Sequence, residues 1–246
     1  MIRSTVPPTP RGFRAQRCDR IRAATLLVAM LLAASGTAIG VTATAEASLS
    51  RAPKGCTVLQ GHGITWPRAS WVSCITGAIA QSSPTVANWD GRTIVAVGDE
   101  NGVLHVIDAA TGREFPGWPQ RLAAPPGATV AIESTPTIAF LDGPDNPPSI
   151  IVGAASTWVH NTAREVEAFR LSGGVRFVFH VGAAPGTAVG VISIPAVGNL
   201  TASPQQDIVF GSWDHYIYAL TPDGKVLPGF PINNTDTIWS SPALYQ

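Results

Sequence analysis

The side chains that could carry chemistry are spread thinly along this chain. Its five histidines fall one to a segment, without the short spacing that metal ligands show: His62, His105, His160, His180 and His215. The chain contains no G-x-S-x-G, no H-E-x-x-H and no glycine-rich phosphate loop. These patterns favour a binding protein over a hydrolase or a phosphate-transfer enzyme.

Two turns gather aromatic and polar residues that could bind a ligand. One is the short turn "GSWDHY", with Trp213, Asp214 and His215. The other is the loop "STWVHNTA", with Trp158 and His160, which is an insertion relative to the other copies of the repeat described below. Exposed turn side chains of this kind could bind a glycan or a loop of an extracellular protein. An ordinary polar turn is the alternative for the first of them.

Two cysteines remain once the N-terminal segment is set aside. Cys56 and Cys74 lie 18 residues apart, and in an exported chain such a pair predicts a disulfide bond. A Cys–His nucleophile at Cys74 is the alternative, but the surrounding "WVSCITG" carries no such signature.

The first 47 residues have the form of a targeting segment. Six arginines precede an apolar run over residues 23–41, and "TATAEAS" offers a cleavage point after Ala47. An uncleaved membrane anchor is the alternative, because the 19-residue run nearly reaches the length that spans a bilayer. Either way the body is predicted to be exported. Residues 48–246 keep 10 basic and 14 acidic side chains, and this balance does not suggest a nucleic-acid partner.

The most informative pattern is an internal repeat. "TIVAVGDENGVLHVIDAATGREFPGWP" over 93–119 matches "DIVFGSWDHYIYALTPDGKVLPGFP" over 207–231 element by element. Each copy reads as short apolar strands joined by turns, with Asn-Gly and Pro-Asp-Gly as turn signals. The repeats open at marker prolines, which are Pro84, Pro136, Pro195 and Pro242.

Units of about fifty residues with four short strands each are typical of β-propeller blades. The sequence therefore predicts an all-β chain of four-stranded antiparallel blades at 82–132, 133–191 and 192–238, with the start of a fourth at 239–246. The second blade carries a seven-residue insertion at 157–163. Residues 48–80 are predicted to be an irregular lead-in, tied down by the disulfide. We expect an incomplete propeller.

The phrase "SSPTVANWDGRTIVAVGDENGVLHVIDAATGREFPGWP" resembles extracellular FG-GAP/VCBS-type propeller repeats and the neighbouring quinoprotein-like (PQQ-like) repeats. The resemblance implies the fold, and a blade-packing role for Trp118. FG-GAP-type blades bind calcium through clustered carboxylates in the loop between their first two strands. In this chain only "LDGPDNPP" keeps two close carboxylates, so the resemblance implies a Ca²⁺ site of Asp142, Asp145 and Asn146. Side-chain-to-backbone turn bonds are the alternative.

The function expected from these patterns is that of an exported, non-enzymatic binding or scaffold protein. Its expected partner is an extracellular protein or glycan, and it would meet a membrane only if the N-terminal segment stays uncleaved. The alternative is the front part of a larger secreted propeller enzyme, quinoprotein-like or a lyase or hydrolase. No catalytic residue can be named from the sequence.

Overall fold

The computed structural model describes residues 71, 73–75, 77–124, 126–127, 129–158, 163–182 and 190–245, all within the unit formed by residues 45–246. The predicted targeting segment, Cys56 and His160 lie outside the described residues, so cleavage and the Cys56–Cys74 pairing stay predictions. In the described part of the chain, no helix is long and apolar enough to cross a membrane.

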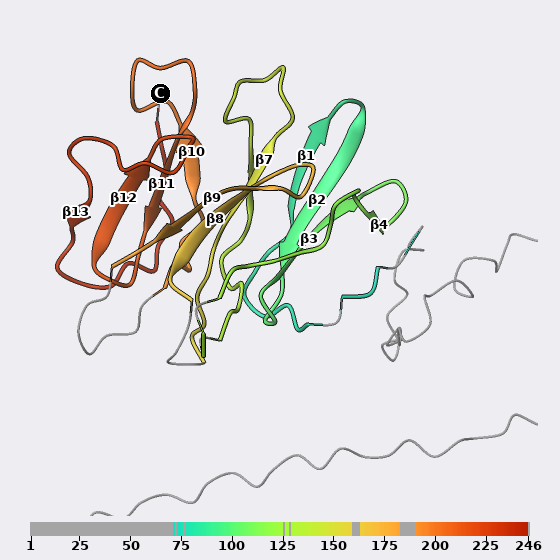
Figure 1. Cartoon of the computed structure of the whole chain (residues 1–246), viewed down its shortest axis with the longest axis horizontal. Helices are drawn as coiled ribbons and strands as arrows, with labels where there is room; N and C mark the ends of the chain where they lie inside the picture. Colours follow the sequence, from blue (N-terminus) through green and yellow to red (C-terminus); the bar gives the residue numbers. More distant parts are fainter. Residues whose placement is uncertain are drawn as a thin grey trace, which may run out of the picture. The chain divides into compact units, whose positions relative to one another are not determined.

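The described residues form three antiparallel sheets (Figure 1). The first sheet has β1 (Thr85–Trp89), β2 (Arg92–Gly98), β3 (Val103–Asp108), β4 (Arg113–Glu114) and β5 (Gln120–Arg121). The second sheet has β6 (Thr137–Ala139), β7 (Ser149–Gly153), β8 (Glu165–Arg170) and β9 (Val175–His180). The third sheet has β10 (Ala196–Gly198), β11 (Asp207–Gly211), β12 (Tyr216–Leu220) and β13 (Ile232–Asn233).

Each sheet is built in sequence order, from an innermost first strand to an outermost last strand. The apolar runs of the repeats form the second strands, and β7 and β11 are buried along their whole length. The protein is therefore all-β, with the four-stranded antiparallel blades of a β-propeller. This prediction is confirmed.

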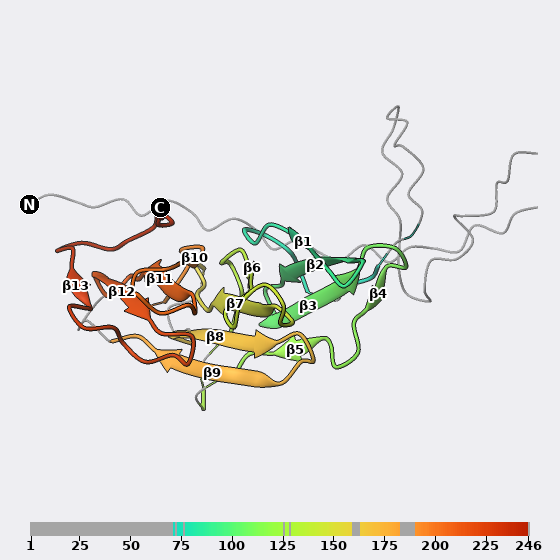
Figure 2. The ribbon, with the colours of Figure 1, turned by 90° about the horizontal axis from the view of Figure 1, so that it is seen from above.

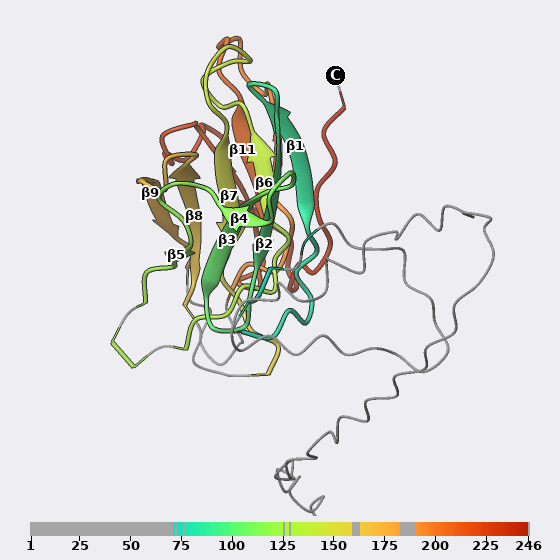
Figure 3. The same ribbon diagram turned by 90° about the vertical axis from the view of Figure 1, so that its right-hand side faces the viewer.

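The sheets face one another at two joints, which we call the first joint (first against second sheet) and the second joint (second against third). One buried apolar cluster fills the first joint and another fills the second. Viewed from above, the inner strands β1, β6 and β10 lie in a row (Figure 2). Viewed from the side, the strands of the three sheets overlap (Figure 3).

The joints repeat the same contacts. A glycine ends each second strand, and a Cβ added there would lie within 2.3 Å of the chain that enters the next sheet. The contacts run from Gly98 to Ile132, from Gly153 to Val191 and from Gly211 to Ile238. The closest atom is an isoleucine methyl group at Gly98 and Gly211 and a backbone carbonyl oxygen at Gly153, and only glycine leaves room for these contacts. The repeat read from the sequence is thus a repeat of packing contacts.

The marker prolines lie where the inner strands meet. Thr85 Oγ1 donates to the carbonyl oxygen of Pro136 and Thr137 Oγ1 to that of Pro195, both at 2.6 Å. A proline donates no hydrogen bond but its carbonyl still accepts one. These two bonds join the inner strands of neighbouring sheets.

The fourth strand of the first sheet is interrupted. β4 and β5 both pair with β3, and the corner 116–119 loops out between them. There Trp118 Nε1 donates to the carbonyl oxygen of Leu171 at 2.7 Å, and the Trp118 ring lies 5.8 Å from that of Phe169. The blade-packing role implied for Trp118 is confirmed. Trp71 makes the corresponding contact with the first sheet, because its Nε1 donates to Ala109 O at 2.6 Å.

Candidate functional site

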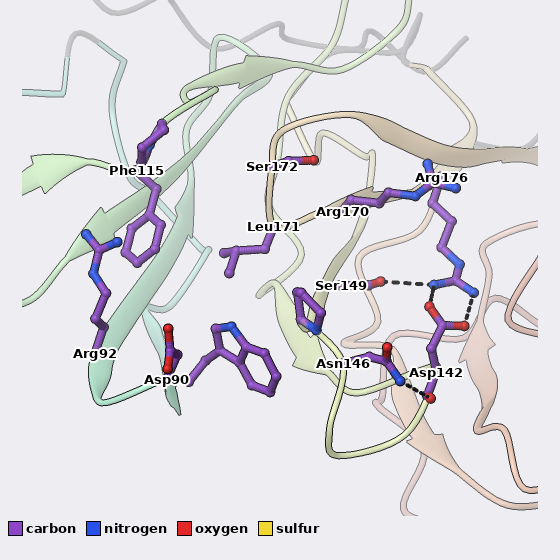
Figure 4. Close-up of a pocket in the computed structure, with 13 residues that line it drawn as sticks. Asp90, Arg92, Phe115, Asp142, Asn146, Ser149, Arg170, Leu171, Ser172 and Arg176 are labelled. Carbon is purple, nitrogen blue, oxygen red and sulfur yellow. Dashed lines mark hydrogen bonds and ion pairs between the residues drawn. The ribbon is translucent and has the colours of Figure 1, made fainter.

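A pocket of about 450 Å³ opens at the first joint (Figure 4). It lies where the corner of the first sheet faces the turn that follows β8. Aromatic, aliphatic and proline side chains supply its apolar lining, and charged or hydroxyl groups supply the rest. The lining residues are Trp89, Asp90, Arg92, Phe115, Pro116, Asp142, Asn146, Pro147, Ser149, Arg170, Leu171, Ser172 and Arg176.

The first sheet supplies the aromatic wall. Trp89 ends β1 and packs on Phe140, with ring centroids 5.7 Å apart. The guanidinium carbon of Arg92 lies 4.1 Å from the centre of the Phe115 ring, a cation–π contact. Arg92 also donates to Asp108 Oδ2 from Nε and Nη2, at 2.9 and 2.5 Å, and this hydrogen bonding lowers the pKa of Asp108.

The second sheet supplies the polar wall. Arg176 donates from Nη1 and Nη2 to the two carboxylate oxygens of Asp142, at 2.5 and 2.7 Å. This bidentate pair lowers the pKa of Asp142 and raises that of Arg176. Figure 4 shows Leu171 between this polar wall and Phe115.

The calcium site predicted at Asp142, Asp145 and Asn146 stays a prediction, and the structure shows a competing partner for its first ligand. Both carboxylate oxygens of Asp142 already accept from Arg176, and the side-chain amide of Asn146 donates to the Asp142 carbonyl oxygen at 2.8 Å. In the described part of the chain, no three His, Cys, Asp or Glu side chains are arranged to hold a metal ion. The Asn146 bond is the side-chain-to-backbone turn contact given as the alternative.

The turn at 213–215 was expected to expose its side chains, and for two of the three this is wrong. Trp213 and Asp214 are each 2% exposed. The Trp213 ring packs 4.7 Å from that of Trp239, and Asp214 Oδ2 accepts from the Tyr218 hydroxyl at 2.6 Å. Packing and hydrogen bonding draw both side chains inward, which leaves His215 as the accessible member of the turn.

The inserted loop does expose its tryptophan. Trp158 is 78% exposed, while the neighbouring Thr157 amide donates to Glu133 Oε1 at 2.7 Å and holds the start of the loop. His160 lies outside the described residues. The binding role predicted for this loop stays a prediction.

Sequence reasoning missed the pocket because its walls come from two different repeats. Trp89, Phe115 and Leu171 each read as ordinary strand or turn residues within their own copy. One sequence signal was present: the corner "FPGWP" of the first repeat has no counterpart in the second, which reads "FVFHV". The pocket's lining combines aromatic rings with carboxylate, guanidinium, amide and hydroxyl groups.

No protein-family model matches the chain, and no curated protein matches it. Solved structures do match, and three of them are β-propeller proteins. BBS1N in complex with ARL6DN shares 17% identity over 71% of this chain and 51% of that chain, with a TM-score of 0.42. BamB from Moraxella catarrhalis shares 16% over 70% and 56%, with a TM-score of 0.31. Quinohemoprotein alcohol dehydrogenase from Comamonas testosteroni shares 15% over 60% and 34%, also with a TM-score of 0.31. The chain thus spans about half of the first two proteins and a third of the last.

Proposed function

We propose that this protein is an exported, non-enzymatic binding module that holds one ring of a glycan in the pocket at the first joint. The observation that carries the proposal is the pocket's lining, in which an aromatic wall faces charged and amide groups. Pockets that bind small molecules combine apolar walls with a few placed polar groups in this way.

A sugar ring suits both halves of this lining. Its C–H face is apolar enough to lie against Trp89, which is half-buried, with the buried Phe115 behind that wall. Its hydroxyl groups can both donate and accept hydrogen bonds. Asp90 and Asn146 offer accepting oxygens at the pocket edge, and Arg92 offers donors. Because Asp108 neutralises Arg92 and Asp142 neutralises Arg176, a neutral ligand fits better than a strongly charged one.

Binding of neutral oligosaccharides, followed by tryptophan fluorescence and calorimetry, tests the proposal. Trp89→Ala should weaken binding at least tenfold, because the half-buried ring of the aromatic wall is lost. Trp158→Ala is the matched control, since it removes an exposed tryptophan from the inserted loop. Binding that survives Trp89→Ala but is lost in Trp158→Ala would move the site to the loop. Absence of binding across neutral and acidic oligosaccharides would overturn the proposal.

Export is tested separately, by N-terminal sequencing of the protein recovered from culture medium. A mature chain that begins at Ser48 supports cleavage after Ala47. Retention of the protein inside the cell would contradict export.

A further inference from the structure

Two glutamates of β8 are buried at the first joint. Glu165 is 0% exposed and Glu167 is 1% exposed. Residues two apart on a strand point to the same face, and Phe169, two residues further on, belongs to the apolar cluster of the first joint. Both carboxyl groups therefore point from the second sheet towards the first.

One of the two already connects the sheets. Glu167 Oε1 accepts a hydrogen bond from the backbone amide of Ala123 at 2.6 Å, and Ala123 follows the last strand of the first sheet. The two oxygens of Glu165 have no hydrogen-bond partner among the described residues. A buried carboxylate without partners is far costlier than a buried carboxylic acid. Burial raises the pKa of Glu165 and of Glu167 to about 7.

Few charges face this pair. On β9, His180 Nδ1 lies 3.3 Å from Glu165 Oε2, and the His180 side chain is 64% exposed. Within the described residues it is the one basic side chain at ion-pair distance from either glutamate. Arg176, also on β9, is bound to Asp142, and Arg121, on the covering strand β5, donates to Asn101 O. Arg164 precedes β8 directly, and the neighbouring strands β3 and β7 contribute apolar side chains to this joint.

We propose that Glu165 and Glu167 form a proton-dependent latch that closes the second sheet on the first. With both carboxyl groups protonated, the joint is neutral and packed. Loss of the protons places two negative charges in an apolar joint. Because each carboxylate then needs hydration or a cationic partner, the joint loosens. The pocket has walls from the same two sheets, so its shape depends on the same protons.

The direction of the effect follows from proton linkage. A carboxyl group whose pKa is higher in the folded chain than in the unfolded chain stabilises the fold fully below the unfolded value, here 4.5. That stability is lost as the pH rises through the folded value, about 7. The latch is therefore closed in mild acid and opens in mild alkali.

Denaturant unfolding of the whole chain between pH 5.5 and 8.0 tests the latch. Each glutamate should raise the unfolding equilibrium constant roughly 30-fold over this interval. The variant Glu165→Gln/Glu167→Gln should lose most of this dependence, because an amide stays neutral. Asp145→Asn, which alters an exposed carboxylate, should keep it. A wild-type stability that is level or rises from pH 5.5 to 8.0 overturns the proposal, as does an unchanged pH dependence in the double variant.

Infrared spectroscopy of the folded chain gives a readout that does not depend on unfolding. The carbonyl band of protonated carboxyl groups should be present at pH 6 and fade towards pH 8, and each single Glu→Gln variant should reduce it. A band that is absent at pH 6 also overturns the latch. Neither measurement requires a ligand, so the latch can fail while the proposed glycan binding stands, and the reverse.

Discussion

The two joints have the same framework and different contents. At both, a glycine receives the incoming chain and an inner threonine bonds to a marker proline. At the second joint Arg176 reaches across to the third sheet and donates to Pro222 O at 2.8 Å. At the first joint no arginine of the described residues crosses to the equivalent turn, and a pocket of about 450 Å³ opens beside Leu171 and Ser172. The shared glycine and threonine contacts hold neighbouring blades together. The residues that differ between the repeats form the pocket.

The acidic groups of the joints differ in the same way. At the first joint burial raises the pKa of Glu165 and Glu167. The edge of the second joint has Asp142, where hydrogen bonds from Arg176 lower the pKa. One joint keeps its carboxyl groups neutral, and the other pairs its carboxylate with a cation. Each arrangement avoids an unpaired buried charge, which at the first joint would be a carboxylate and at the second joint is the guanidinium of Arg176, 7% exposed.

The largest expected effect is at the corner of the first sheet. Trp118→Ala should lower the free energy of unfolding by about 3–5 kcal/mol, because it empties a buried aromatic site and removes the bond to Leu171. Phe230, the corresponding corner residue of the third sheet, is partly exposed, so Phe230→Ala should cost less. Denaturant unfolding measures both. Equal losses would contradict the view that only the first of these corners is docked on a neighbouring sheet in the described structure.

The next effect is at the second joint. Arg176→Met should lower the free energy of unfolding by about 1–2 kcal/mol, because it removes the hydrogen bonds to Asp142 and to Pro222 O while the exposed carboxylate of Asp142 stays hydrated. Adding Asp142→Asn should restore part of the loss, since the unpaired charge is then gone. Thermal unfolding of the single and double variants is the measurement. A double variant less stable than Arg176→Met would contradict a charge-pairing role for Arg176.

A smaller effect separates the joints by pH. The pKa of Asp142 lies below its ordinary value of 3.8, so its contribution is present above that value and is lost as the pH falls through the lowered one. Asp142→Asn should therefore remove part of the acid destabilisation below about pH 4. The loss of stability between pH 5.5 and 8.0, which the two glutamates cause, should stay unchanged. Melting temperatures between pH 3 and 8 measure both. A change confined to the alkaline side would refute this division between the joints.

The smallest effect concerns the inner strands. Thr85→Val should cost about 1 kcal/mol, because it removes one hydrogen bond to Pro136 while keeping the side-chain shape. Thr137→Val should cost the same, because it removes the equivalent bond to Pro195. Denaturant unfolding of the two variants side by side compares the joints directly. A clear difference between them would show that the inner contacts are not equivalent.

The blades could be predicted from the sequence alone. Strand periodicity, turn glycines and marker prolines act locally or recur at fixed spacing, so the three sheets and the insertion could be read without a structure. The blade-packing role of Trp118 was also predictable, from the resemblance of its repeat to quinoprotein-like repeats.

The site could not be predicted from the sequence, because it depends on contacts between sheets. Trp89, Phe115, Leu171 and Arg176 meet because two sheets face each other, and no local pattern records which residues of one repeat face those of another. The same reason explains the failures. From the sequence, Trp213 and Asp214 belong to an exposed turn. In the structure Trp239 packs on Trp213, and the Tyr218 hydroxyl donates to Asp214. From the sequence, Asp142 is a candidate calcium ligand. In the structure both its carboxylate oxygens accept hydrogen bonds from Arg176, 34 positions away. Burial and pairing depend on neighbours distant in the chain, and those neighbours set the chemistry of these side chains.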